Sequence, residues 1–196
     1  MRQTIGVLSL QGDFAEHIRA IKACGAKAKL VKTSDDLADV DHLIIPGGES
    51  TVIGLLLRNY NMIIPIQKFI RQNKPVFGTC AGLILLADKV ADQSENGRIK
   101  IGGLPVRVRR NFLGSQLQSF ETELQAKKIS PRPLKAVFIR PPEILEIGAE
   151  VEILAQYQFK TRTSPVALRY KNIFATSFHS EFDKSNPATK YFLAMK

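Results

Sequence analysis

Cys80 stands at the centre of the pattern GTCAG, residues 78–82, which directly follows the apolar residues 75–77. Glycines two places away on either side relieve the crowding of a sharp strand-to-helix turn, whose apex residue is held in an unfavourable backbone conformation. At such an apex the Cys80 sulfur lies at a helix N-terminus, where the dipole and free N–H groups favour thiolate, the reactive form. The pattern predicts a nucleophile elbow with Cys80 as the nucleophile; the alternative is a small buried apolar residue.

A base for this nucleophile is found near the C-terminus. His179 and Glu181 follow an apolar run at residues 173–178 and are two places apart. In an extended chain they project to the same side, where the carboxylate can hold the tautomer of the imidazole and stabilise its cation. His17 and His42 have no carboxylate partner at this spacing, and we interpret both as structural.

A glycine-rich loop, PGGES at residues 46–50, supplies a second group of site candidates. Its glycines allow backbone N–H groups to approach a ligand, and Ser50 is expected to cap a helix at residues 51–60. The alternative for this loop is a plain helix-entry turn, since Gly-Gly is a common loop dipeptide.

The elements that must position these residues alternate between strands and helices. Apolar runs predict strands at residues 4–10, 28–31, 42–45 and 75–77, and apolar spacing predicts helices at 13–24, 34–39, 51–60, 63–73 and 83–89. Asp13 and Glu16 are expected to be a capping pair for the first helix. The alternation favours a three-layer α/β/α fold with a mainly parallel sheet and helices on both faces. Loops at the carboxyl ends of such strands line the ligand crevice.

The C-terminal half is organised differently. After a polar loop at residues 92–97, short alternating or apolar runs recur between turn residues, at 105–109, 119–124, 134–139, 151–156, 165–169 and 173–178. They predict antiparallel strands added to the α/β core. A chain of 196 residues is long enough for one such unit, so we expect a single domain over residues 1–196.

The composition excludes several classes of protein. Cys24 and Cys80 are the only cysteines, so there is no disulfide framework, and no metal-ligand spacing relates them to the three histidines. Residues 2–4 lead directly into a strand, without a secretory segment, and no apolar run approaches membrane-spanning length. We expect a soluble, cytoplasmic protein without metal, cofactor or membrane contact, in which Cys24 belongs to the core.

The net charge of +10 is unevenly distributed. Residues 1–96 hold 11 Lys and Arg against 10 Asp and Glu, whereas residues 97–196 hold 17 against 8. Such an excess is one feature of nucleic-acid binders, but these basic residues form no single stripe and lack interleaved surface aromatics. A solvated or protein-docking face is the preferred interpretation, and binding of a nucleic acid would show itself by a steep salt dependence.

Taken together, the motifs resemble those of the class I glutamine amidotransferases, and more narrowly the glutaminase subunits of pyridoxal 5′-phosphate synthases. The resemblance extends from residue 5 to residue 182. Its motifs are LQG at 10–12, PGGEST at 46–51, GTCAG at 78–82, Arg110-Asn111, SFE at 119–121, VFIR at 137–140 and His179-x-Glu181. At residues 111–116 the chain departs from the family pattern and lacks its arginine, which affects partner contacts or loop geometry more than chemistry.

The resemblance implies a role for each matching residue. Cys80 would attack the side-chain amide of L-glutamine, His179 would act as base and then acid, and Glu181 would orient His179. Backbone N–H groups of Gly48 and Ala81 would form the oxyanion hole. The implied glutamine-binding positions are Gly48, Glu49, Ser50, Arg110, Ile139 and Arg140. Guanidinium groups are suitable partners for the α-carboxylate of glutamine.

The resemblance also implies a partner. Ammonia would pass to a separate synthase subunit, in a large hetero-oligomer that builds pyridoxal 5′-phosphate from ribose 5-phosphate and glyceraldehyde 3-phosphate. One alternative is the glutaminase subunit of another amidotransferase, such as imidazole glycerol phosphate synthase. A different class of alternative is a non-enzymatic or chaperone-like protein with the same elbow, which the pair of His179 and Glu181 disfavours.

Overall fold

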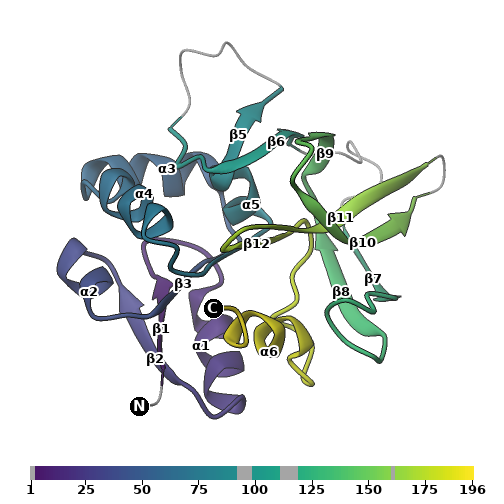
Figure 1. Cartoon of the computed structure of the whole chain (residues 1–196), viewed down its shortest axis with the longest axis horizontal. Coiled ribbons are helices and arrows are strands. Elements are labelled where there is room, and N and C mark those ends of the chain that lie inside the picture. Colours follow the sequence, from purple (N-terminus) through teal and green to yellow (C-terminus); the bar gives the residue numbers. More distant parts are fainter. Residues whose placement is uncertain (1–2, 92–98, 111–118, 160–161) are drawn as a thin grey trace.

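A seven-stranded sheet forms the centre of the computed structural model, which describes residues 3–91, 99–110, 119–159 and 162–196 (Figure 1). The strand order is β10-β11-β12-β4-β3-β1-β2. Five neighbouring strands are parallel: β12 (Ile173–Thr176), β4 (Val76–Thr79), β3 (His42–Ile45), β1 (Thr4–Leu8) and β2 (Lys27–Val31). The other two, β10 (Glu152–Gln158) and β11 (Thr163–Tyr170), are antiparallel and extend the sheet beyond β12.

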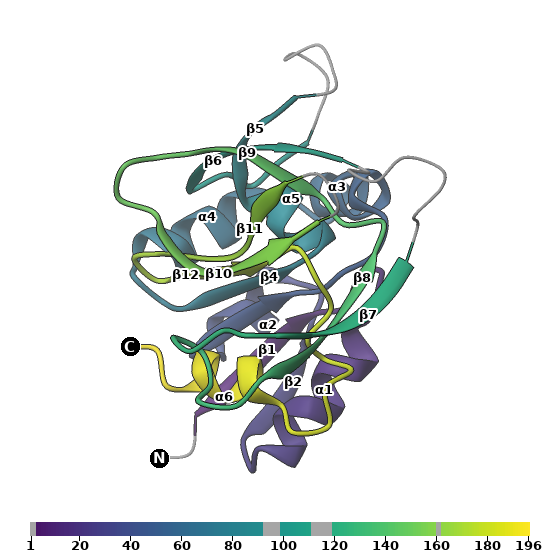
Figure 2. The same cartoon turned by 90° about the vertical axis from the view of Figure 1, so that its right-hand side faces the viewer.

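Two apolar cores cover the two faces of this sheet, which explains why its central strands are buried along their whole length. One core packs α3 (Ser50–Asn59), α4 (Ile63–Arg71), α5 (Ala81–Leu86) and the short α2 (Ser34–Ala38) on one face. The other packs α1 (Phe14–Ala23), α6 (Pro187–Leu193) and a hairpin of β7 (Ser119–Leu124) and β8 (Leu134–Ile139) on the opposite face (Figure 2). The predicted three-layer α/β/α fold with added antiparallel strands is confirmed.

One predicted helix is wrong in its second half. Residues 83–89 were expected to be helical, but α5 ends at Leu86 and Ala87–Val90 forms β5. β5 pairs in parallel with β6 (Leu104–Arg109), which also pairs with β9 (Glu143–Ile147) in a separate three-stranded sheet. Pairing with a distant strand therefore outweighs the local preference for helix at this point.

Both predicted helix caps are also wrong. Asp13 is the N-cap residue of α1, but its side chain makes no capping hydrogen bond among the described residues. The carboxylate is turned toward His179 instead. At α3 the N-cap is Glu49, whose carboxylate accepts a bond of 2.9 Å from the N–H of Thr51, and Ser50 is already the first helical residue. Asp13 thus contacts His179 instead of capping α1, and Glu49 caps α3 in place of Ser50.

The other predicted helices and strands differ from the observed ones mainly in the residues at which they begin and end. Residues 9–10 lie beyond the end of β1, and Cys24 is the half-buried C-cap of α1 rather than a core residue. β9 and α6 were not predicted from the sequence. The predicted loops at 92–97 and 111–116 lie outside the described residues. In the described part of the chain, no helix has the length and apolar character needed to cross a membrane.

Candidate active site

Cys80 lies at the sharp turn between β4 and α5, with φ 49° and ψ −99°, a region that non-glycine residues seldom adopt. Its backbone N–H donates a 2.8 Å hydrogen bond to the carbonyl of Thr176 in the neighbouring strand β12. A Cβ atom on Gly78 would lie 2.7 Å from the carbonyl carbon of Gly82, and one on Gly82 would lie 2.2 Å from the carbonyl oxygen of Ile45. The predicted elbow is confirmed, together with its need for both glycines.

His179 and Glu181 lie in the segment that follows β12, and they interact as predicted. Nδ1 of His179 is 2.7 Å from Oε1 of Glu181, and both side chains are almost completely buried. The backbone of His179 is fixed by two hydrogen bonds with Val137 in β8, of 2.8 and 3.3 Å. The Cys80 side chain is also among the groups that raise the pKa of His179, which relates this pair to the elbow.

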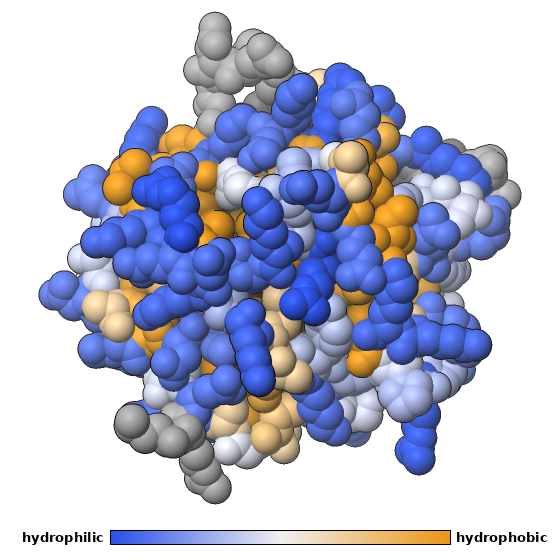
Figure 3. All heavy atoms as spheres, in the orientation of Figure 1, coloured by the Kyte–Doolittle hydropathy of each residue, from blue (hydrophilic) through white to orange (hydrophobic). Residues whose placement is uncertain are grey.

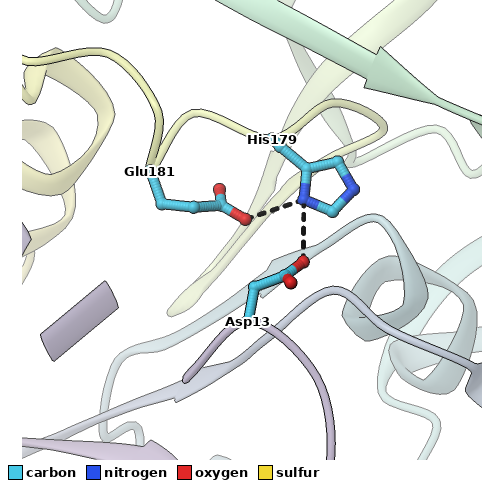
Figure 4. A group of neighbouring side chains, drawn as sticks. All are labelled: Asp13, His179 and Glu181. Carbon is cyan, nitrogen blue, oxygen red and sulfur yellow. Dashed lines mark hydrogen bonds and ion pairs between the residues drawn. The ribbon is translucent and has the colours of Figure 1, made fainter. Parts of the chain in front are cut away.

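A second carboxylate also reaches His179. Oδ2 of Asp13 lies 3.3 Å from the same Nδ1 atom, so that both carboxylates approach this nitrogen (Figure 4). The ring edge lies so close to Gly47 that a Cβ atom there would be 2.3 Å from Cε1 of His179. Sequence reasoning missed this contact, because it assigned Asp13 to a helix cap.

The two carboxylates set the charge of His179. Burial alone would lower the pKa of this imidazole, but hydrogen bonds to Asp13, Cys80 and Glu181 raise it to about 12. His179 is therefore an imidazolium at neutral pH, with Nδ1–H directed at carboxylate oxygens.

The same geometry bears on metal binding. Ligand-capable atoms of Asp13, His179 and Glu181 lie within 4.8 Å of one another. A metal ligand must be a neutral imidazole nitrogen with a free lone pair, whereas the two carboxylates beside Nδ1 favour a proton on this nitrogen. The arrangement thus fits a hydrogen-bonded imidazolium better than a metal centre.

His17 also lies beside Glu181. From the sequence, only His179 was expected to have a carboxylate partner. Its Nε2 atom is 3.6 Å from Oε1 of Glu181 and 3.2 Å from Oγ1 of Thr79, the residue before Cys80. His42 is buried elsewhere, with Nε2 3.1 Å from the carbonyl oxygen of Met195, as a structural histidine should be. The contact of His17 joins residues more than 160 positions apart, and no sequence spacing indicates it.

The glycine-rich loop lies against the first turn of the chain. The carbonyl of Gly47 accepts a 3.0 Å hydrogen bond from the N–H of Asp13. Since a trans peptide directs its C=O and N–H to opposite sides, the N–H of Gly48 points away from Asp13. The positive φ of 152° at Gly48, and the 2.6 Å that would separate a Cβ there from Oε1 of Gln11, leave room for glycine alone. Ala81 opens α5, so its N–H has no acceptor inside the helix.

Glu49 and Arg110 form an ion pair beside this loop. Nη2 of Arg110 is 2.6 Å from Oε1 of Glu49, and Nη1 donates to Oγ1 of Thr51 at 2.9 Å. The N–H of Thr51 holds the pKa of Glu49 below its usual value, and Arg110 acts in the same direction. Ser50 is buried at the start of α3. A carboxylate and a guanidinium that lie side by side match the charges of the α-ammonium and α-carboxylate groups of a free amino acid.

The remaining predicted glutamine-binding residues, Ile139 and Arg140, lie at the end of β8. Sγ of Cys80 is 3.8 Å from the carbonyl oxygen of Ile139, whose side chain is 39% exposed. Arg140 follows with φ 44°, so the chain turns sharply at the end of β8. Of the predicted residues, the structure thus brings Ile139 of β8 to the sulfur of the elbow.

Comparison with known proteins defines the class. A solved structure described as "Crystal structure of glutamine amidotransferase" superposes with a TM-score of 0.88 at 38% identity and covers 96% of each chain. PurLQS from Thermotoga maritima, at 14% identity and a TM-score of 0.74, shares the fold over 98% of each chain. The fold is therefore that of the class I glutamine amidotransferases.

The family follows from the sequence comparison. The SNO glutamine amidotransferase family matches residues 7–196. A protein of Niallia circulans named pyridoxal 5′-phosphate synthase subunit PdxT is 48% identical over 191 residues, 97% of this chain and 96% of the relative. An Arabidopsis thaliana protein named probable pyridoxal 5′-phosphate synthase subunit PDX2 is 38% identical over 217 residues, 98% and 85% of the two chains. The chain belongs to the SNO glutamine amidotransferase family, whose enzymes hydrolyse glutamine.

Proposed function

We propose that this chain is the glutaminase subunit of a pyridoxal 5′-phosphate synthase, in which it hydrolyses L-glutamine and delivers the ammonia to a separate synthase subunit. The observation that carries the proposal is Cys80 at the apex of the elbow, together with the buried pair of His179 and Glu181 whose imidazole pKa responds to the Cys80 side chain. The name shared by the relatives favours this assignment over the glutaminase subunit of another amidotransferase.

The reaction begins with attack of the Cys80 sulfur, as thiolate, on the carboxamide carbon of glutamine. The N–H groups of Gly48 and Ala81 stabilise the oxyanion that forms as the carbonyl π bond opens. His179 then gives its proton to the departing nitrogen, which leaves as ammonia when the C–N bond breaks, and a thioester remains. The raised pKa of His179 ensures that this proton is present from the start.

Hydrolysis of the thioester uses the same residues in the opposite sense. The imidazole, now neutral, removes a proton from water, and the resulting hydroxide attacks the thioester carbon. The C–S bond breaks, the Cys80 thiolate is restored, and glutamate leaves. Throughout the cycle the buried Glu181 carboxylate keeps Nδ1–H of His179 directed toward itself, so that the other ring nitrogen carries out the proton transfers.

Substrate recognition is assigned to the charges beside the elbow. Glu49 would bind the α-ammonium group of glutamine, and Arg110 with Arg140 would bind its α-carboxylate. Ser50 and the backbone of Ile139 complete the pocket. The distance of 2.6 Å between Glu49 and Arg110 supports the proposal. The two side chains carry opposite charges side by side, as do the ammonium and carboxylate groups of the zwitterion that they would bind.

The peptide between Gly47 and Gly48 would link this activity to the partner. Glycine reverses a peptide at little steric cost, and reversal here would exchange the N–H of Gly48 for a carbonyl in the crevice. Loss of one oxyanion donor typically costs ~10²–10³ in rate, which would leave the free subunit almost inactive. The synthase subunit would favour the active orientation by binding it more tightly.

The test is release of ammonia from glutamine by this chain with and without the synthase subunit. We expect a rate with the partner that is about 10²-fold higher or more. Alkylation of Cys80 by iodoacetamide should proceed equally in both samples, which shows that the sulfur itself is unchanged. Failure to hydrolyse glutamine in the presence of the partner would contradict the proposed function, and equal rates in both samples would contradict the gate alone.

A further inference from the structure

His17 is a fully buried residue of α1 that the proposed reaction does not use. Its ring packs edge-on against Phe77, with centroids 6.1 Å apart, and its Nε2 atom faces Glu181 and Thr79 at 3.6 and 3.2 Å. His17 therefore bridges the carboxylate that supports His179 and the residue that precedes Cys80.

The protonation state of His17 follows from its surroundings. Burial lowers the pKa of this imidazole more than the nearby Glu181 carboxylate raises it, and the positive charge of His179 lowers it further. His17 is therefore neutral at pH 7 and carries one proton on one ring nitrogen. The carboxylates of Asp13 and Glu16 act on it more weakly.

The position of that proton is set by the neighbours of Nε2. A lone pair on Nε2 would face the carboxylate oxygen of Glu181, which repels it, whereas an N–H there donates to the hydroxyl of Thr79 at 3.2 Å and turns its positive end toward Glu181, 3.6 Å away. Nδ1 has no hydrogen-bond partner among the residues that the structure describes, and an unsatisfied acceptor costs less than a misdirected donor. The geometry thus places the proton on Nε2.

Glu181 depends on the dipole of this N–H because few other polar groups face its carboxylate. Its side chain is 0% exposed, its Oε2 atom has no partner in the described part of the chain, and Oε1 lies 2.7 Å from Nδ1 of His179 and 3.6 Å from Nε2 of His17. Burial alone would raise the pKa of Glu181, yet the pKa is lowered because the imidazoles of His17 and His179 lie against it. A buried carboxylate with so few hydrogen bonds is sensitive to the loss of a nearby N–H dipole.

We propose that His17 is a positioning residue of the glutaminase reaction, whose neutral Nε2–H holds the Glu181 carboxylate in the orientation that directs His179 toward Cys80. Its bond to Thr79 fixes this carboxylate relative to the elbow. The inference rests on the proposed function, since Glu181 has to orient His179 for His17 to matter.

The test compares two amide substitutions of similar polarity. The longer side chain of His17→Gln brings an N–H close to the place of Nε2, whereas the amide of His17→Asn reaches only the place of Nδ1. The matched control is His42→Asn, which removes a second buried histidine at the start of β3, at the end of the strand opposite to the elbow. Each variant is purified in complex with the synthase subunit, and kcat, KM and the thermal midpoint are measured.

We expect His17→Asn to lower kcat about tenfold, since both the hydrogen bond to Thr79 and the N–H dipole beside Glu181 are lost, with KM changed less than about twofold. His17→Gln should restore kcat to within about threefold of the wild type. His42→Asn should lower the thermal midpoint about as much as His17→Asn does, but it should leave kcat unchanged. Equal kcat in His17→Asn and the wild type, or equal impairment in the Asn and Gln variants, would overturn the role of His17.

A measurement on the unmodified chain keeps the proposal testable if a variant does not fold. Nitrogen-15 NMR of the histidine rings distinguishes the two neutral tautomers from the imidazolium. Neutral His17 with the proton on Nε2 at pH 7 is the expected result, and a proton on Nδ1 or a doubly protonated ring would overturn it. A wild-type complex that fails to hydrolyse glutamine would instead overturn the proposed function and leave this spectrum as the test of the geometry.

Discussion

At the scale of single residues, His179 is the point where the charges of the site converge. It contacts a buried carboxylate at 2.7 Å and a partly exposed one at 3.3 Å, and its pKa is raised by these groups and by Cys80. Because His179 moves protons whereas Glu181 only orients and stabilises it, the two residues should differ in their importance.

We therefore predict that His179→Asn is at least as damaging as Glu181→Gln. The histidine variant should lose about 10³-fold or more in kcat, since triad residues act as a unit. The measurement is glutamine turnover in complex with the synthase subunit. Near-normal turnover of His179→Asn would mean that the base lies elsewhere.

Asp13 gives a second prediction. Replacement of Asp13 by Asn removes one of the carboxylates that hold the pKa of His179 at about 12, so this pKa should fall, while Glu181 keeps it above the ordinary value of 6.5. Asp13 is partly exposed, so the loss of kcat should be small, about fivefold. NMR titration of His179 checks the direction of the shift.

The matched control for this variant is Glu16→Gln. Glu16 lies in the same helix and pairs with Arg19 on the surface, so its loss should leave the titration of His179 unchanged. A His179 titration that is identical in Asp13→Asn and in the wild type would show that the contact with Asp13 has no energetic weight.

Residue types predicted part of this site and not the rest. Cys80, His179 and Glu181 were predictable because glycine spacing and strand alternation are local patterns. Asp13 and His17 were not, since each meets its partner across more than 160 positions, and the local pattern of Asp13 with Glu16 is equally typical of a helix cap. Only the assembled sheet brings α1 to the last loop of the chain.

At the scale of elements, the elbow requires backbones to approach more closely than a side chain allows. We predict that Gly82→Ala destabilises the chain by about 2–4 kcal/mol, because its Cβ would meet the carbonyl oxygen of Ile45 at 2.2 Å. The control is Gly25→Ala, where φ is 77° but no atom lies within 4 Å, so only backbone strain of about 1 kcal/mol is expected.

Urea unfolding of the two variants measures this difference. A Gly82→Ala protein as stable as Gly25→Ala would contradict the close packing of α5 against β3. In a folded fraction of Gly82→Ala, slower alkylation of Cys80 would further show that the elbow had been displaced.

The elements that the sequence did not predict lacked a decisive local signal. β5 follows directly from α5 without a glycine or proline between them, and it is a strand because β6 pairs with it. α6 begins after Asn186 in a left-handed conformation without a side-chain cap, and Pro187 at its first turn was the available sign. The parallel core was predictable because strands buried on both faces are continuously apolar.

At the scale of the whole molecule, the site exists only when the chain is folded throughout. α1, the loop before α3, the elbow, the end of β8 and the segment after β12 all contribute to it. The outer face in Figure 3 is largely hydrophilic, with apolar atoms over α3 and α4. Val52, Leu55, Tyr60 and Ile64, between 41% and 66% exposed, belong to this part of the chain.

The measurement that tests the central claim most directly separates the supply of ammonia from its use. The chain with Cys80→Ala is combined with the synthase subunit, and pyridoxal 5′-phosphate formation is followed with glutamine or with an ammonium salt as the nitrogen source. Because Cys80 is required for the thioester but not for the chemistry of the partner, we predict that glutamine no longer supports synthesis whereas ammonium still does. Substantial synthesis from glutamine by the Cys80→Ala complex would contradict the account.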